Sequence, residues 1–174
     1  RQWGPPFVDG VAAYYRGVNR NKQGRTLDLS SPGGRAALLA LLEDAAAEPE
    51  EAIRRRLLTF VIAGGGFAGV ETAGAVNDFL RDAIRQYPEL DPSMLRLVLV
   101  HSGDVVLPEL GDRLGHYAQK HLRHRGVEFK LGTRVTGFDR WLVALSQGEP
   151  IPANTLVWTA GVKPTPVVES LTVE

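Results

Sequence analysis

The chain has 174 residues, of which 44% are hydrophobic and 23% charged, a composition typical of one globular domain with a substantial core. Basic and acidic residues both number 20, so no net charge draws the chain to nucleic acid or to an acidic membrane. The absence of cysteine excludes disulfides, thiolate zinc sites and a dithiol redox centre, and no apolar run approaches the ~20 residues of a membrane helix.

Residues 1–32 match no recognisable pattern and stay unassigned, because turn-forming clusters such as GPPF and NRNKQG interrupt them. The chain does not begin with Met, and we expect it to be a part of a longer protein. Residues 33–56 are predicted to form a helical flank, in which apolar residues recur at helical spacing and Pro49 separates two helices.

Strand and helix patterns then alternate along the chain. The apolar runs LLTFVIA and RLVLV predict strands buried on both faces of a parallel sheet, and VEFKLG predicts a third. Helices are expected between them, the second of which ends at Gly126 as its C-cap. The predicted elements are a strand over 57–63, a helix over 67–86, a strand over 96–100, a helix over 110–126 and a strand over 127–132.

The last third of the chain lacks a helical pattern. Short strand-like runs over 133–139, 140–146 and 150–161 predict an antiparallel three-stranded meander inserted into the sheet. A last strand is expected over 155–160, with Trp158 in the core. We therefore predict an α/β, Rossmann-like fold of three layers, with a parallel sheet and the inserted meander.

Three consecutive glycines directly after a buried-strand pattern form the most informative motif. Gly64-Gly65-Gly66-Phe67-Ala68-Gly69 matches G-x-G-x-x-G, the dinucleotide-binding fingerprint. Its first glycine permits a tight turn, its second lets the backbone approach a pyrophosphate, and its third lets the helix pack closely on the strand. Since a strand precedes the motif and a helix follows it, we predict that these residues bind a dinucleotide at the helix N-terminus. The alternative is a glycine-rich turn without a ligand.

The turn after the second strand does not choose between NAD and NADP. His101 takes the place at which a ribose-binding carboxylate is usual, with Ser102 next to it and Asp104 beyond. No arginine stands in this turn to bind a 2′-phosphate. We predict His101 and Ser102 as cofactor-binding residues and NAD(H) as the cofactor, and NADP(H) stays open.

No other grouping of side chains predicts a site. His116, His121 and His124 share one helix with Arg123 and Arg125, which favours a solvated basic face over a metal site. No Ser-His-Asp arrangement or hydrolytic pair of carboxylates is recognisable. We expect no metal.

Four stretches carry a resemblance to a known family. They are LLTFVIAGGGFAGVETAG, VLVHSGDVVLPELGDRL, RGVEFKLGTRVTGFD and IPANTLVWTAGVKPTP, which together cover roughly residues 33–170. Through them the chain resembles the FAD-dependent pyridine nucleotide-disulfide oxidoreductases, and among these the type II NADH dehydrogenases. The resemblance implies that residues 57–161 are the NAD(P)H-binding domain and that 162–174 return toward a FAD-binding domain missing from this chain.

The resemblance also implies an activity and its residues. Such enzymes pass a hydride from NADH to FAD and electrons to a quinone; the present chain alone is not expected to hold FAD or to turn over. Glu71 is implied to lie beside the nicotinamide as a catalytic residue, and Ala160 and Gly161 to bind the cofactor. We place Val135 against the adenine. The parent enzyme is expected in the cytoplasm, at most peripherally on the membrane through segments absent here, with no nucleic-acid partner.

Two other readings stay open. The chain could belong to another FAD/NAD(P) reductase of the superfamily, although the lack of cysteine argues against a sulfide enzyme. It could also be a non-catalytic NAD(H)-binding module. A flavin fingerprint upstream in the parent reading frame would separate the enzyme from the module.

Overall fold

The computed structural model describes residues 7–8, 11–12 and 31–160, and the chain divides into two compact units, residues 1–35 and 36–174. In the first unit, β1 (Phe7–Val8) pairs antiparallel with β2 (Val11–Ala12). Most of the unassigned segment 1–32 lies outside the described residues. The elements that position the candidate site all belong to the second unit.

A parallel sheet of four strands forms the centre of the second unit. Its order is β5 (Val127–Lys130), β4 (Arg96–Val100), β3 (Thr59–Ala63), β9 (Thr155–Trp158), and all neighbouring pairs are parallel. β3 is buried at every position and β4 at all but its first residue. Their continuous apolar patterns arise because both faces of these central strands are covered.

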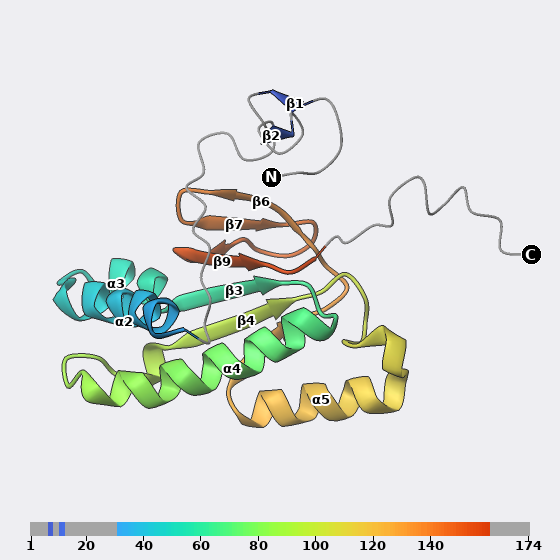
Figure 1. Ribbon diagram of the computed structural model, residues 1–174, viewed down its shortest axis with the longest axis horizontal. Coiled ribbons are helices and arrows are strands. Elements are labelled where there is room, and N and C mark those ends of the chain that lie inside the picture. The colour runs from blue at the N-terminus through green and yellow to red at the C-terminus, as the bar shows by residue number, and fades with distance from the viewer. Residues whose placement is uncertain (1–6, 9–10, 13–30, 161–174) are drawn as a thin grey trace, which may run out of the picture. The chain divides into compact units, whose positions relative to one another are not determined.

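Two helices cover one face of this sheet (Figure 1). They are α4 (Phe67–Ala83), which η1 (Ile84–Gln86) continues as a 3-10 turn, and α5 (Asp112–His124). The residues that α4 buries recur at helical spacing: Gly69, Ala73, Val76, Asn77, Leu80 and Ala83. α5 ends at the predicted place, since Gly126 adopts φ +90° and its N–H bonds the Arg123 carbonyl at 2.9 Å.

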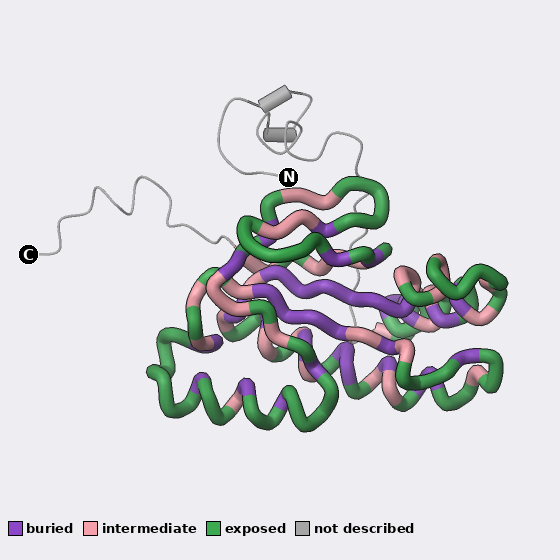
Figure 2. Tube along the Cα trace, turned by 180° about the vertical axis from the view of Figure 1, so that it is seen from behind, coloured by how far each residue is buried: buried purple, intermediate pink, exposed green. Residues whose placement is uncertain are grey.

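A three-stranded antiparallel sheet covers the other face. It consists of β6 (Val135–Asp139), β7 (Leu142–Leu145) and β8 (Ile151–Pro152). Between the two sheets lies a cluster of small and branched apolar side chains, Val61, Ala63, Val98, Val100, Val135, Val143, Ile151 and Ala153. Figure 2 shows the buried central strands between more exposed outer layers. The three-layer α/β fold with an antiparallel insertion is thereby confirmed.

Two helices precede the sheet, as predicted. α2 (Pro32–Ala47) buries Leu38, Leu42 and Ala45, which are spaced to lie on one face, and α3 (Glu51–Leu57) leads into β3. The predicted strand start at residue 57 was wrong, because Leu57 closes α3 and Leu58 is its C-cap. The short 3-10 turn η2 (Pro92–Met94) precedes β4. Within the described ranges, no helix is long and apolar enough to cross a membrane.

The expectation that Trp158 belongs to the core was wrong. Its side chain is 59% exposed, and its indole N–H donates to the Ala160 carbonyl at 2.6 Å. Trp158 is the last residue of β9, and β9 is an edge strand of the parallel sheet. The residue lies where the sheet has no further strand to cover it.

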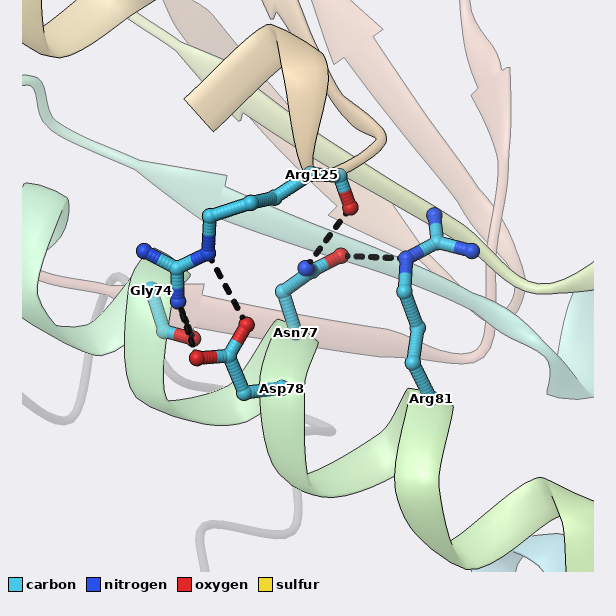
Figure 3. Close-up of polar contacts among 5 residues, drawn as sticks. All are labelled: Gly74, Asn77, Asp78, Arg81 and Arg125. Carbon is cyan, nitrogen blue, oxygen red and sulfur yellow. Dashed lines mark hydrogen bonds and ion pairs between the residues drawn. The ribbon is translucent and has the colours of Figure 1, made fainter. Parts of the chain in front are cut away.

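A buried polar group joins α4 to the turn between α5 and β5 (Figure 3). Asn77 is 1% exposed; its amide donates to the Arg125 carbonyl at 3.0 Å and accepts from Arg81 Nε at 2.9 Å. Arg81 also donates to the Gly126 carbonyl, and the Arg125 guanidinium pairs with Asp78, which lowers the pKa of that carboxyl. This group, the α4 clamp (Asn77, Asp78, Arg81 and Arg125), fixes the helix whose N-terminus forms the candidate site.

Candidate functional site

The predicted site residues meet at the C-terminal end of the parallel sheet. The loop Gly64–Gly66 joins β3 to α4, and the segments after β4 and β9 pack against it. Gly64 N–H donates to the Val100 carbonyl at 2.8 Å, which ties the loop to the end of β4. Ligands of open α/β sheets bind at this end of the strands.

Gly64 and Gly69 are required by close backbone packing. Gly64 has φ +120°, and a Cβ there would lie 2.7 Å from Thr159 Oγ1 and 2.9 Å from the Ala160 nitrogen. A Cβ on Gly69 would lie only 1.8 Å from the Gly64 carbonyl oxygen. A side chain at either position would therefore push α4 or β9 away from the loop.

Gly66 faces open space instead. A Cβ built on it would find nothing outside its own neighbours within 4 Å. Gly66 is the N-cap of α4 and offers no side-chain acceptor, so the amides of Phe67 and Ala68, both exposed, are left for another partner. Uncapped amides at the positive end of a helix, with room in front of them, form a binding site for an anionic group.

Gly65 is held at both ends of its backbone by the segment that follows β4. Its N–H donates to His101 Nδ1 at 3.1 Å, and its carbonyl accepts from the Leu107 N–H at 2.8 Å. A Cβ on Gly65 would lie 2.5 Å from His101 Cγ, so the imidazole packs directly against this backbone. Leu107 adopts φ +52°, a left-handed conformation that aims its N–H at the loop and precedes η3 (Pro108–Leu110).

The His101 ring is neutral in this arrangement. Nδ1 accepts a hydrogen bond and so carries no proton. Burial lowers the pKa of His101, while a backbone hydrogen bond with Val105 and the charge of Glu109 raise it to a smaller extent.

Comparison with known proteins identifies the family. The model of the pyridine nucleotide-disulphide oxidoreductases matches residues 25–174. The chain belongs to this family. A second family model, CoA-transferase family III, matches residues 1–48, most of which lie outside the described residues.

Several curated relatives of this pyridine nucleotide-disulphide oxidoreductase are type II or alternative NADH dehydrogenases. The chain is 32% identical over 133 residues to the type II NADH:quinone oxidoreductase Ndh of Mycobacterium tuberculosis, covering 74% of this chain and 29% of the relative. It is 36% identical over 118 residues to the mitochondrial internal alternative NAD(P)H-ubiquinone oxidoreductase A1 of Arabidopsis thaliana, covering 68% of this chain and 23% of the relative. The chain thus spans less than a third of the length of these relatives.

A solved structure shows the same fold. NDH2 from Plasmodium falciparum in complex with NADH superposes with a TM-score of 0.68 at 16% identity, over 79% of this chain and 29% of that one. The likeness concerns the arrangement of strands and helices. It agrees with the three-layer architecture described above.

The remaining predicted residues of this oxidoreductase chain differ in their exposure and surroundings. Glu71 is exposed on α4, and Ser102 is exposed directly after His101. Val135 is 7% exposed within the cluster between the two sheets, so its side chain serves packing, and a contact with adenine from this position stays a prediction. The Ala160 nitrogen lies beside Gly64, whereas Gly161 lies outside the described residues.

Sequence reasoning missed three residues that support the loop. Thr159 donates its hydroxyl to the Ala63 carbonyl at 2.8 Å, directly behind Gly64. Leu107 holds the Gly65 carbonyl, and buried Gln119 of α5 accepts from the Val106 N–H at 3.3 Å just before it. Thr159 lies within the WTAG stretch and could have been singled out there; Leu107 and Gln119 carry no signal in the sequence.

Proposed function

We propose that residues 57–161 form the NADH-binding domain of a FAD-dependent NADH dehydrogenase that reduces a quinone. One observation carries the proposal: the open space at Gly66 in front of the uncapped N-terminus of α4. The curated relatives described above, which are NADH or NAD(P)H:quinone oxidoreductases, support the choice of reaction. These two relatives favour this reaction over the alternatives of another FAD/NAD(P) reductase or a non-catalytic module.

The residues present fit a dinucleotide. The pyrophosphate would lie against Gly66, where the absence of a side chain lets it approach the backbone, and the Phe67 and Ala68 amides would donate to its oxygens. Ser102, which is exposed two residues after β4, would contact the adenine ribose. NADH, when bound, supplies the hydride that reduces the flavin.

Glu71 is proposed to act at the nicotinamide end. It lies one turn into α4, exposed on the helix that begins at the open space. A carboxylate there can stabilise developing positive charge or relay a proton. In the complete enzyme, Glu71→Gln is expected to change turnover, or its pH dependence, more than NADH affinity. Steady-state kinetics that are unchanged across the pH range would remove Glu71 from the mechanism.

The proposal requires two partners for residues 57–161. A FAD-binding domain would supply the flavin and the rest of the nicotinamide contacts, and a quinone would accept the electrons. We place the parent enzyme in the cytoplasm, associated peripherally with the membrane through other segments. An absorbance spectrum and an NADH oxidation assay on the chain alone test this division: a flavin band with turnover would show that the chain needs no second domain.

Gly66→Val tests the site itself. Gly66 has φ −76°, which valine adopts, and the Cβ of the new side chain would enter the open space with no atom of the fold beyond its chain neighbours within 4 Å. We expect NADH affinity, measured by calorimetry, to fall by at least about tenfold, or ~1.4 kcal/mol. Gly33→Val is the matched control, because a Cβ there also meets nothing within 4 Å. Equal NADH affinity in the two variants would contradict the proposal.

A further inference from the structure

The feature that the proposed function leaves unexplained is the position of the His101 ring. A residue at the end of the second strand is expected to reach toward the ribose. His101 instead turns its Nδ1 to the Gly65 N–H at 3.1 Å, beneath the glycine loop. Nδ1 is therefore occupied and is not available to a ribose hydroxyl.

We propose that His101 is a positioning residue whose neutral imidazole holds the Gly65 peptide, so that protonation of the ring loosens the glycine loop and weakens nucleotide binding. This inference rests on the proposed function, because it assumes that the loop binds the pyrophosphate. It adds a dependence on pH that the glycine fingerprint alone does not contain.

The geometry gives the imidazole little freedom to move away. One side of the ring packs against Gly65, where a Cβ would lie 2.5 Å from Cγ, and Nε2 lies 3.0 Å from the Cβ position of Gly103. The backbone of His101 is fixed as well, since its N–H bonds the Lys130 carbonyl at 2.9 Å and its carbonyl accepts from Thr133 at 3.2 Å. A change at Nδ1 must therefore be taken up by the loop.

Protonation turns an attraction into a repulsion. In the neutral ring Nδ1 accepts from Gly65, whereas in the imidazolium both nitrogens carry protons, and an N–H would face an N–H. The Gly65 carbonyl would stay bonded to Leu107, so the peptide would have to rotate about that contact. Rotation would shift Gly66 and the first amides of α4, which the proposed function assigns to the pyrophosphate.

The burial of the ring and the charges around it set the pH at which His101 is protonated. On the surrounding segments the charged residues are Glu109 on η3, Asp104 in the same turn and Lys130 at the end of β5. Burial lowers the pKa of His101, and the Glu109 charge opposes this to a smaller extent. The lowered pKa means that the folded loop favours the neutral ring. Nucleotide affinity therefore has its full value at neutral pH and decreases as the pH falls through the pKa of His101.

Two substitutions separate the effect of the Gly65–His101 hydrogen bond from the effect of protonating His101. His101→Asn places an amide oxygen where Nδ1 stood, so it keeps an acceptor for Gly65 and removes the proton equilibrium. His101→Ala removes the acceptor. His116→Asn is the control, because His116 is an exposed histidine on α5 whose Nδ1 contacts only the Asp112 carbonyl of its own helix.

The experiment is a calorimetric titration of each variant with ADP-ribose from pH 5 to pH 8. ADP-ribose carries the pyrophosphate and is stable in acid. For the wild type and His116→Asn we expect constant affinity near neutral pH and a loss of up to about tenfold per pH unit below the pKa of His101. We expect His101→Asn to be independent of pH, and His101→Ala to bind at least about threefold more weakly, again without pH dependence.

The outcomes distinguish this inference from the proposed function. The role of His101 is overturned if the wild-type affinity is independent of pH, or if it rises in acid because the phosphate competes for the Gly65 N–H. The proposed function is not affected by that result. The same holds if His101→Asn keeps the wild-type pH profile. If no variant binds ADP-ribose, the proposed function fails, and NMR of the His101 imidazole nitrogens still tests the hydrogen bond to Gly65: an unprotonated Nδ1 at neutral pH supports it, and a protonated Nδ1 refutes it.

Discussion

The four glycines of the fingerprint have three different physical roles. Gly64 and Gly69 avoid contacts with neighbouring backbone, Gly65 accommodates the His101 ring, and Gly66 leaves space open. Only the last of these concerns a ligand directly. The others hold the loop in the shape that brings the amides of α4 to the surface. We therefore expect a substitution at Gly69 to lower the stability of the fold and one at Gly66 to lower nucleotide affinity.

Two glycine substitutions on α4 are expected to have opposite effects on stability. Gly69→Ala places a Cβ 1.8 Å from the Gly64 carbonyl and should lower the free energy of unfolding by about 1–3 kcal/mol. Gly74→Ala finds its nearest atoms at 3.7 Å, an ordinary contact, and should raise stability by about 0.5–1 kcal/mol, as alanine favours a helix. Urea unfolding of both variants measures the difference, and equal effects would show that Gly69 is not packed as described.

The residues of the site were predictable to different degrees. Gly64, Gly66 and Gly69 are recognisable from their spacing, because the fingerprint is local in the chain. The contact of His101 with Gly65 joins residues 36 positions apart and depends on the register of β3 and β4, which no local pattern encodes. The left-handed Leu107 is likewise set by its tertiary contacts, since nothing in a leucine favours φ +52°.

At the scale of elements, α4 is the part that links the core to the site. Its N-terminus borders the candidate site, and the α4 clamp ties its middle to the turn after α5 (Figure 3). The order of strands and helices followed from apolar runs and helical spacing. The exposure of Trp158 did not, because an apolar strand pattern does not reveal whether a strand is central or at an edge.

Loss of the buried amide should weaken this link. Asn77→Ala leaves the Arg125 carbonyl without its donor and Arg81 Nε without its acceptor, and we expect a loss of about 1–3 kcal/mol in the free energy of unfolding. Asp82→Ala on the same helix is the control, since within the described residues Asp82 pairs with Arg85 at 3.8 Å between exposed side chains. It should change stability by less than about 0.5 kcal/mol. If Asn77→Ala and Asp82→Ala give the same urea unfolding curve, the α4 clamp does not contribute to stability.

At the scale of the whole molecule, the proposed function assigns one half of a reaction centre to this chain. The loop, the N-terminus of α4 and the ends of β4 and β9 are local to residues 57–161. We therefore expect a nucleotide to bind without a second domain. In the proposed function, a FAD-binding domain adds contacts to the nicotinamide that residues 57–161 do not make by themselves. We therefore expect NADH to bind weakly, roughly between micromolar and millimolar, which corresponds to ~4 to 8 kcal/mol.

The central claim is that the nucleotide binds at the glycine loop, and an NMR titration of the 174-residue chain with NADH tests it most directly. Backbone amide signals report each residue separately, and binding is detected even when it is weak. We predict the largest shifts for Gly64–Gly69 and for the turn from His101 to Asp104, with little change on the exposed face of α5. Shifts centred on α5, or none up to millimolar NADH, would contradict the account.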